Sequence, residues 1–248
     1  MSISYSIIAD KLTKTFGDFT AVDAISLEVK SGEIFGFLGA NGAGKTTAMR
    51  MFTGLSLPTS GKAFVAGFDV YTETEKIKKS IGYMSQKFSL YQDLTVKENI
   101  TFYGGIYGVY GAAMKTAMDE MLVKLGMAAE KNTLVSELPL GWKQKLSFSL
   151  AILHKPGIVF LDEPTGGVDP VTRRQFWTMI YEAAESGITV FVTTHYMDEA
   201  EYCNRVAIMV DGKIEAMGSP SELKLQHAAN SMDDMFYRLA RKASRNDM

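Results

Sequence analysis

The sequence of 248 residues predicts an α/β fold built on a parallel sheet, long enough for one large domain or for a core with a small appended subdomain. The first observation is an apolar run at 34–38 that leads into a glycine-rich loop and then a segment with helical spacing. The second is a pair of short, almost wholly apolar runs at 157–164 and 187–195, with a helical segment at 173–186 between them. This order is typical of a βαβ unit whose strands are covered on both faces.

The other elements follow in order along the chain. Residues 3–36 alternate and turn as short strands, and residues 58–70 indicate another short strand pair. Between about 88 and 155 the spacing is mostly helical, which predicts a helical insert. The run at 205–218 predicts a hairpin around an Asp-Gly turn, and residues 222–248 predict a helical tail.

Composition excludes several functional classes. With 26 Lys and Arg against 28 Asp and Glu, the chain has no global attraction for nucleic acid, so we expect no nucleic-acid partner and local phosphate binding only. The N-terminal segment does not resemble a secretory signal, and no apolar run approaches the roughly 18 to 20 residues of a membrane helix. The single cysteine, Cys203, predicts a buried small hydrophobe in a reducing compartment.

The glycine-rich loop reads GANGAGKT, which matches the P-loop (Walker A) pattern G-x-x-x-x-G-K-[ST] between a strand and a helix. Glycines let backbone N–H groups turn toward phosphate oxygens, and the helix adds its positive end. We expect Lys45 to reach the β- and γ-phosphates and the Thr46 hydroxyl to bind Mg²⁺. The predicted nucleotide-binding residues of this loop are Gly39, Ala40, Asn41, Gly42, Ala43, Gly44, Lys45, Thr46 and Thr47.

A second acidic site follows the apolar run IVFLDEP. Asp162 lies at the end of this predicted strand, where it can hold Mg²⁺, and Glu163 comes next. A carboxylate at that place is suited to orient or deprotonate a water that attacks the γ-phosphate. A strand that ends in Asp-Glu is common, so its weight comes from the P-loop upstream.

In the order of these features the chain resembles the nucleotide-binding domain of ATP-binding cassette (ABC) transporters over nearly its whole length. The resemblance implies a P-loop NTPase fold: a RecA-like core with a small antiparallel β subdomain and an α-helical subdomain. It implies a cassette at residues 1–221 followed by the tail at 222–248.

Further residues are assigned through this resemblance. Phe16 matches the aromatic that stacks on adenine, although it could instead pack under a turn. Gln86 resembles the glutamine that touches Mg²⁺ or water and couples to the membrane partner. Asp169, in GGVDP, resembles the D-loop aspartate at the dimer seam, and His195 resembles the switch histidine that contacts the γ-phosphate. Glu163, His195 and Gln86 are thus the predicted catalytic group, and Thr46, Gln86 and Asp162 the predicted metal group.

The stretch LPLGWKQKL departs from the family pattern. Related cassettes usually carry LSGGQ, whose serine and glycine grip ATP held by the other subunit. Here the register is filled by Leu138, Pro139, Leu140, Gly141 and Trp142. Proline offers neither a hydroxyl nor an N–H donor, so we expect this loop to close on the partner's ATP but to bind it weakly, through the N–H groups of Gly141 and Trp142.

The resemblance also implies partners and place. We expect ATP and Mg²⁺ as cofactors, a second nucleotide-binding subunit in a homodimer or heterodimer, and a membrane permease, of the ABC-2 exporter type. The chain would be cytoplasmic and peripheral on the inner face of the membrane. The expected docking region follows Gln86, with Phe88, Leu90 and Tyr91 as anchors. Two alternatives stay open: an ABC-type ATPase acting on a non-transport partner, and a regulatory cassette with weak hydrolysis because of Pro139.

Overall fold

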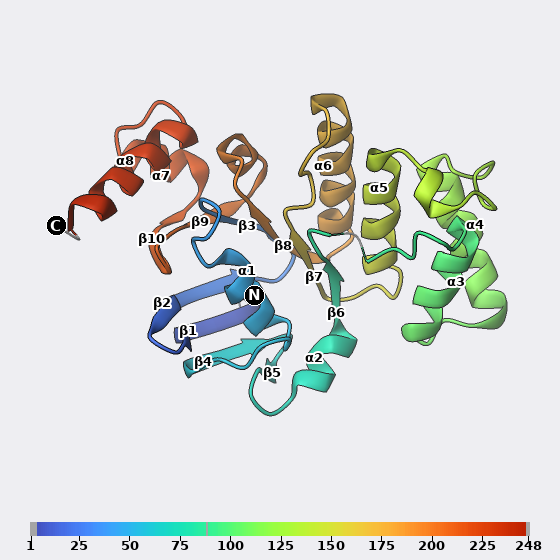
Figure 1. Ribbon diagram of the computed structural model, residues 1–248, viewed down its shortest axis with the longest axis horizontal. Coiled ribbons are helices and arrows are strands. Elements are labelled where there is room, and N and C mark those ends of the chain that lie inside the picture. The colour runs from blue at the N-terminus through green and yellow to red at the C-terminus, as the bar shows by residue number, and fades with distance from the viewer. Residues whose placement is uncertain (1–3, 88, 247–248) are drawn as a thin grey trace.

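The core of the fold is a six-stranded sheet, in a computed structural model that describes residues 4–87 and 89–246 (Figure 1). Its strand order is β10-β9-β3-β8-β7-β6, and every neighbouring pair except β10 with β9 is parallel. The strands are β3 (Ile34–Leu38), β6 (Ile81–Met84), β7 (Ile158–Asp162), β8 (Thr189–Thr194), β9 (Arg205–Val210) and β10 (Lys213–Gly218). All residues of β3, β7 and β8 are buried, which confirms the predicted strands covered on both faces.

Alternate residues of one strand enter two different cores. Phe35 and Phe37 of β3 belong to the cluster of buried residues that contains helix α1 (Lys45–Phe52). Ile34 and Leu38 of the same strand belong to the cluster that contains α6 (Pro170–Glu185). This is the period of two expected of a strand, and it places α1 and α6 on opposite faces of the sheet.

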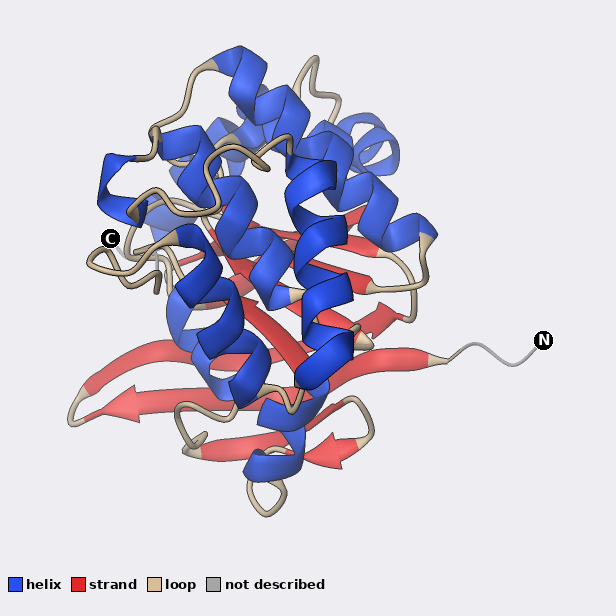
Figure 2. Cartoon of the chain, turned by 90° about the vertical axis from the view of Figure 1, so that its right-hand side faces the viewer, coloured by secondary structure: helices blue, strands red, loops and turns tan. Residues whose placement is uncertain are grey.

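A second, four-stranded sheet packs over α1 and forms the lower part of the molecule in Figure 2. Its order is β2-β1-β4-β5, and it is antiparallel throughout. The strands are β1 (Tyr5–Phe16), β2 (Phe19–Lys30), β4 (Ser60–Val65) and β5 (Phe68–Asp69), with the short helix α2 (Thr74–Ser80) after them. The predicted N-terminal strands and the strand pair at 58–70 are therefore both present.

The predicted helical insert is a subdomain with its own core. It contains α3 (Val96–Ile106), α4 (Gly111–Leu125), the 3₁₀ turn η1 (Val135–Glu137) and α5 (Leu140–Ala151). A capping box between Thr95 and Glu98 fixes the start of α3. Leu146 and Leu150 of α5 face the helical core, whereas Phe148 of the same helix packs into the cluster around α6. Helix α5 therefore joins the subdomain to the sheet.

The C-terminal part begins with the predicted hairpin. Asp211 and Gly212 have φ values of 45° and 82°, as a type I′ turn requires, and join β9 to β10. After η2 (Met197–Tyr202) and this hairpin come α7 (Pro220–Gln226) and α8 (Met232–Asn246). The expected boundary between residues 221 and 222 falls inside α7. No helix in the described part of the chain has both the length and the apolar character needed to span a membrane.

Candidate active site

The loop between β3 and α1, residues 39–44, has a geometry that requires glycine. Gly42 and Gly44 have φ values of 85° and 103°, in the region that other residues rarely adopt. A Cβ on Gly44 would lie 2.3 Å from the carbonyl oxygen of Ala21. The helix α1 consequently starts at Lys45, directly after the loop, with its first N–H groups at the loop.

This loop surrounds a cavity of about 310 Å³. The cavity is lined by Phe19, Ala21, Asn41, Gly42, Gly44, Lys45, Thr46, Thr47, Gln86 and Glu163. Six residues of the predicted P-loop set are thus on the cavity wall, together with Gln86 and Glu163 from other parts of the chain. Gly39, Ala40, Ala43 and Phe16 are not among its lining residues.

Lys45 lies inside the loop and is almost fully buried. Its Nζ donates to the carbonyl oxygens of Gly39 and Ala40, at 2.8 and 3.0 Å, and lies 3.5 Å from Oε1 of Glu163. Burial lowers the pKa of Lys45, and the charges of Glu163 and Asp162 oppose that effect. The ammonium is therefore held inside the loop, between two backbone carbonyl oxygens and the Glu163 carboxylate.

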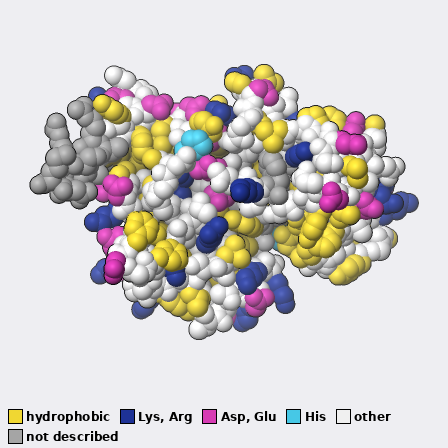
Figure 3. All heavy atoms as spheres, viewed as in Figure 1, with side chains coloured by type: hydrophobic (Ala, Val, Ile, Leu, Met, Phe, Trp, Pro, Cys, Tyr) yellow, Lys and Arg dark blue, Asp and Glu magenta, His cyan; other side chains and the backbone are white. Residues whose placement is uncertain are grey.

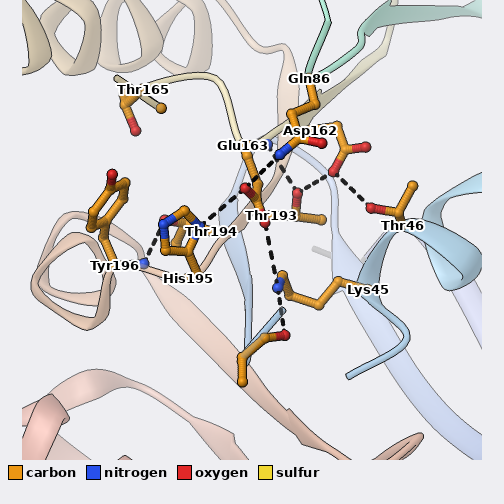
Figure 4. Close-up of polar contacts among 12 residues, drawn as sticks. Lys45, Thr46, Gln86, Asp162, Glu163, Thr165, Thr193, Thr194, His195 and Tyr196 are labelled. Carbon is orange, nitrogen blue, oxygen red and sulfur yellow. Dashed lines mark hydrogen bonds and ion pairs between the residues drawn. The ribbon is translucent and has the colours of Figure 1, made fainter. Parts of the chain in front are cut away.

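Glu163 lies at the centre of the site and contacts several of its residues (Figure 4). Gln86 Nε2 donates to its Oε2 at 2.9 Å, and Nδ1 of His195 lies 3.0 Å from the same oxygen. The backbone is strained, because φ is 48° at a residue with a Cβ. The Glu163 N–H donates to the carbonyl and hydroxyl oxygens of Thr193, which hold this conformation. The three predicted catalytic residues are therefore in direct contact.

Asp162 forms a smaller group with two threonines. Its Oδ1 accepts hydrogen bonds from Thr193 Oγ1 at 2.7 Å and from Thr46 Oγ1 at 3.3 Å. Burial raises the pKa of Asp162, the Glu163 charge adds to the rise, and the threonine hydrogen bonds oppose it. A buried carboxylate beside a hydroxyl, with the Gln86 amide nearby, is an all-oxygen donor set that fits Mg²⁺. A dication at this place would offset the cost of burying the charge.

The two aromatic residues at the tip of the β1–β2 hairpin have different surroundings. Phe16 and Phe19 are paired across the turn, and both are more than half exposed. The Lys14 ammonium lies 5.0 Å from the centroid of the Phe16 ring, whereas Phe19 is the aromatic on the cavity wall. Sequence reasoning missed Phe19 and Thr193. The aromatic pair flanking a Gly-Asp turn could have indicated Phe19, but nothing in the sequence indicates Thr193.

The LPLGW stretch lies at a second cavity, of about 320 Å³, which shares no lining residue with the first. Its walls are Pro139, Leu140, Gly141, Trp142, Lys145, Gly167, Val168, Asp169, Thr172 and Gln175. The predicted signature residues other than Leu138, which is buried in the helical core, therefore meet the predicted D-loop aspartate here.

Pro139 is the N-cap of α5 and provides no side-chain hydrogen bond. The Trp142 N–H donates to the Pro139 carbonyl oxygen at 3.0 Å. We expected this N–H to bind a ligand, but its hydrogen bond to Pro139 makes it unavailable. The N–H groups of Leu140 and Gly141 have no acceptor within the described residues. A Cβ on Gly141 would lie 2.6 Å from Thr172 Cγ2, so glycine permits the close approach of α5 and α6.

Asp169 has a structural contact of its own. Its side chain caps α6, accepting hydrogen bonds from the N–H groups of Val171 and Thr172 at 2.9 and 3.0 Å and from the Thr172 hydroxyl. These hydrogen bonds, that of the Thr172 side chain first, lower the pKa of Asp169. The start of α6 is therefore fixed at the edge of the second cavity.

Comparison with known proteins agrees with this geometry. A profile of the ABC transporter family matches residues 22–166. The chain is 49% identical over 228 residues to the probable multidrug ABC transporter ATP-binding protein YbhF of Escherichia coli strain K12, and 39% identical over 222 residues to the phospholipid-transporting ATPase ABCA3 of Mus musculus. These matches cover 92% and 88% of the chain. The chain spans only 39% and 13% of the lengths of these relatives.

Solved structures share the fold over most of the chain. One is cbiO1 from Clostridium perfringens, part of the ABC transporter complex cbiONQ, with a TM-score of 0.82, 26% identity, and coverage of 90% of this chain and 92% of that one. Another is the ATP-binding cassette MJ0796, in a dimeric post-hydrolysis state bound to ADP and Pi, with a TM-score of 0.78 and 25% identity. That match covers 86% of this chain and 98% of the other. The predicted P-loop NTPase fold is therefore confirmed.

Proposed function

Because this chain belongs to the ABC transporter family, we propose that it binds ATP with Mg²⁺ and hydrolyses it to drive a membrane permease. One observation carries the proposal: Lys45, Gln86 and His195 all contact Glu163 at the wall of the P-loop cavity. These residues come from distant parts of the sequence. A strained backbone at a residue of this kind is expected where chemistry, rather than stability, selects the residue.

Each residue of the site has a task in phosphoryl transfer to water. The loop N–H groups and the Lys45 ammonium would hold the β- and γ-phosphates. Thr46 and Asp162 would hold Mg²⁺, which neutralises phosphate charge when bound. Glu163 would orient the attacking water and accept its proton, while His195 contacts the γ-phosphate. The hydrogen bonds from Gln86 and His195 position the Glu163 carboxylate for that step.

Substitution of Glu163 tests this proposal. We expect Glu163→Gln to lower kcat for MgATP hydrolysis by at least about 100-fold, the usual contribution of a positioned base, while ATP still binds. Lys45→Ala should weaken ATP binding itself. Glu201→Gln, on the surface at the far end of η2, is the control and should leave both quantities unchanged. Hydrolysis that survives Glu163→Gln would refute the assigned role.

The second cavity supports assembly with another cassette. It combines the α5 end with Asp169, and it shares no residue with the P-loop cavity of the same chain. A second subunit would bring its α5 end to the nucleotide held by this P-loop, and the related MJ0796 cassette is a dimer with ADP and Pi. The proposed working unit is thus a dimer that encloses nucleotide between its subunits.

The proposed permease contact is an aromatic patch on the helical subdomain, formed by Tyr91, Phe102, Ile106 and Tyr110. These side chains are between 41% and 68% exposed, and Figure 3 shows hydrophobic side chains gathered over this part of the molecule. The Tyr91 and Phe102 rings meet edge to face, with their centroids 4.7 Å apart. Of the other expected anchors, Leu90 is buried in the helical core and so cannot serve, and Phe88 lies outside the described residues.

The names of the relatives support an exporter. One is described as a multidrug transporter protein and the other as a phospholipid-transporting ATPase, so we infer an apolar or lipid-like cargo and a permease of the ABC-2 type. The chain would then bind the cytoplasmic face of the membrane through that permease.

A further inference from the structure

A fully buried carboxyl group, that of Glu199, lies behind the active site and has no part in the chemistry described above. Its Oε1 accepts a hydrogen bond of 2.5 Å from Thr165 Oγ1. Thr165 is itself buried and comes two residues after Glu163, and Glu199 comes four residues after His195. This hydrogen bond therefore joins the loop that carries Glu163 to the turn that follows His195.

Arg173 is the third member of this cluster and belongs to the first turns of α6. Its Nε lies 3.6 Å from Glu199 Oε1, and its Nη1 lies 3.4 Å from Asp198 Oδ2. Within the described residues, Arg173 Nε and Glu199 Oε2 are buried without a hydrogen-bond partner. The Arg173 side chain therefore lies between two carboxylates of the turn that follows His195.

An aromatic contact closes the path back to the active site. The Arg173 guanidinium lies 4.3 Å from the centroid of the Tyr196 ring. The centroids of the Tyr196 and His195 rings are 4.2 Å apart, and Figure 4 shows the two rings side by side. Asp169, whose side chain caps α6, is one helical turn before Arg173. The cluster therefore connects three segments: the Glu163 loop, the His195 turn and the start of α6.

Burying such a pair is a poor way to gain stability, because the desolvation penalty offsets the attraction between the charges. A hydrophobic cluster of the same volume would serve the fold at least as well. What the pair does provide is a fixed geometry between segments that are far apart in the sequence.

We propose that Glu199 is a positioning residue that, through Thr165 and Arg173, sets the Glu163 and His195 side chains against each other and links them to α6. This inference rests on the proposed ATPase function. None of its three residues lines the P-loop cavity, so they act on the reaction through Glu163 and His195 only.

The test is steady-state MgATP hydrolysis by the full chain. Thr165→Val removes the hydroxyl without changing size or charge, and Glu199→Gln removes the charge. Both should lower kcat by roughly tenfold or more, since small misplacements of catalytic groups are costly, and leave KM within about twofold. Thr165→Ser should restore kcat. The matched control is Glu201→Gln, which breaks the exposed pair with Lys224 on the same turn and should behave like the wild type.

Two kinetic results would overturn the inference: kcat within twofold of wild type in folded Thr165→Val and Glu199→Gln, or a Thr165→Ser variant as slow as Thr165→Val. Loss of folding in both Thr165→Val and Glu199→Gln would also overturn it, because it would mean a structural role. A wild-type chain that does not hydrolyse ATP would refute the proposed function instead. The NMR shifts of the His195 ring then decide: they should move in Thr165→Val while those of His227 stay, and an unmoved His195 ring refutes the inference.

Discussion

Glu163 combines a strained backbone with side-chain contacts to several residues of the site. Its left-handed backbone costs on the order of 1–3 kcal/mol, and the two hydrogen bonds from its N–H to Thr193 hold it in place. Because both carboxylate oxygens have partners, Oε1 near Lys45 and Oε2 near Gln86 and His195, the side chain has little freedom. A phosphate that engages Lys45 must compete with this carboxylate, so nucleotide binding and the placement of Glu163 depend on each other.

At the residue scale, the predicted adenine contact can be tested with the hairpin aromatics. Phe19 lies on the cavity wall, and the ammonium of Lys14 lies over the ring of Phe16. We therefore expect Phe19→Ala to weaken MgATP binding by roughly 5- to 150-fold, the loss of about 1–3 kcal/mol of stacking. Phe16→Ala should have a smaller effect. Titration calorimetry with MgATP measures both.

Inorganic tripolyphosphate is the control ligand for this experiment, because it has phosphates but no base. Its affinity should be equal in the wild type and both variants. If Phe16→Ala weakens MgATP binding and Phe19→Ala does not, adenine stacks on Phe16, as the family resemblance implies, and not on Phe19 of the cavity wall.

Much of this site could be predicted from the sequence, because its residues stand in local motifs. The P-loop pattern identified Lys45 and Thr46, and the end of an apolar strand identified Asp162 and Glu163. Thr193 could not be found in the same way, since its role depends on β7 and β8 being neighbours, with Asp162 opposite Thr193. Contacts set by strand order leave no local pattern in the sequence.

At the element scale, the start of α5 is the weakest part of the proposed site. Pro139 fits the N-cap through its φ of −57°, but it has no side-chain acceptor for the N–H groups of the first turn. Gly141 is needed for the contact with α6, which explains why a glycine is present here although the serine is not. The sequence predicted this defect. It did not predict that Trp142 would donate to Pro139, because that depends on the conformation of the first turn.

Replacing the proline tests the importance of this helix end. Pro139→Ser supplies a cap, which should stabilise the chain by about 1 kcal/mol in thermal or denaturant unfolding. It also supplies a hydroxyl donor for the nucleotide of a second subunit. We therefore expect kcat of the assembled complex to rise, by up to about 100-fold.

The matched variant is Pro139→Ala, which removes the ring without adding a hydroxyl. It should not raise kcat. Equal rates for the two variants would mean that the helix end does not contact nucleotide, or that Leu140 and Gly141 already suffice.

At the scale of the whole molecule, residues 4–87 and 89–246 form three hydrophobic clusters, and α5 takes part in two of them. The helical subdomain is also tied to α6 by an exposed ion pair of 2.7 Å between Lys124 and Glu182. Exposed pairs of this kind are weak, so α5 is the main connection. A load applied to the helical subdomain would thus be transmitted to the second cavity, at whose edge α5 begins.

The aromatic patch is the proposed permease contact, and its role can be tested with one substitution. Ile106 is 61% exposed at the end of α3, so Ile106→Asp should not disturb the core. If the patch docks the permease, this charge should reduce the yield of the co-purifying membrane protein by roughly 30-fold, the loss of one anchor worth about 2 kcal/mol. Hydrolysis of MgATP by the chain alone should not change. Val123→Asp, at a side chain that is 74% exposed on α4 and lies outside the patch, is the control and should retain the membrane protein. Equal recovery with both variants would place the permease contact elsewhere on the cassette.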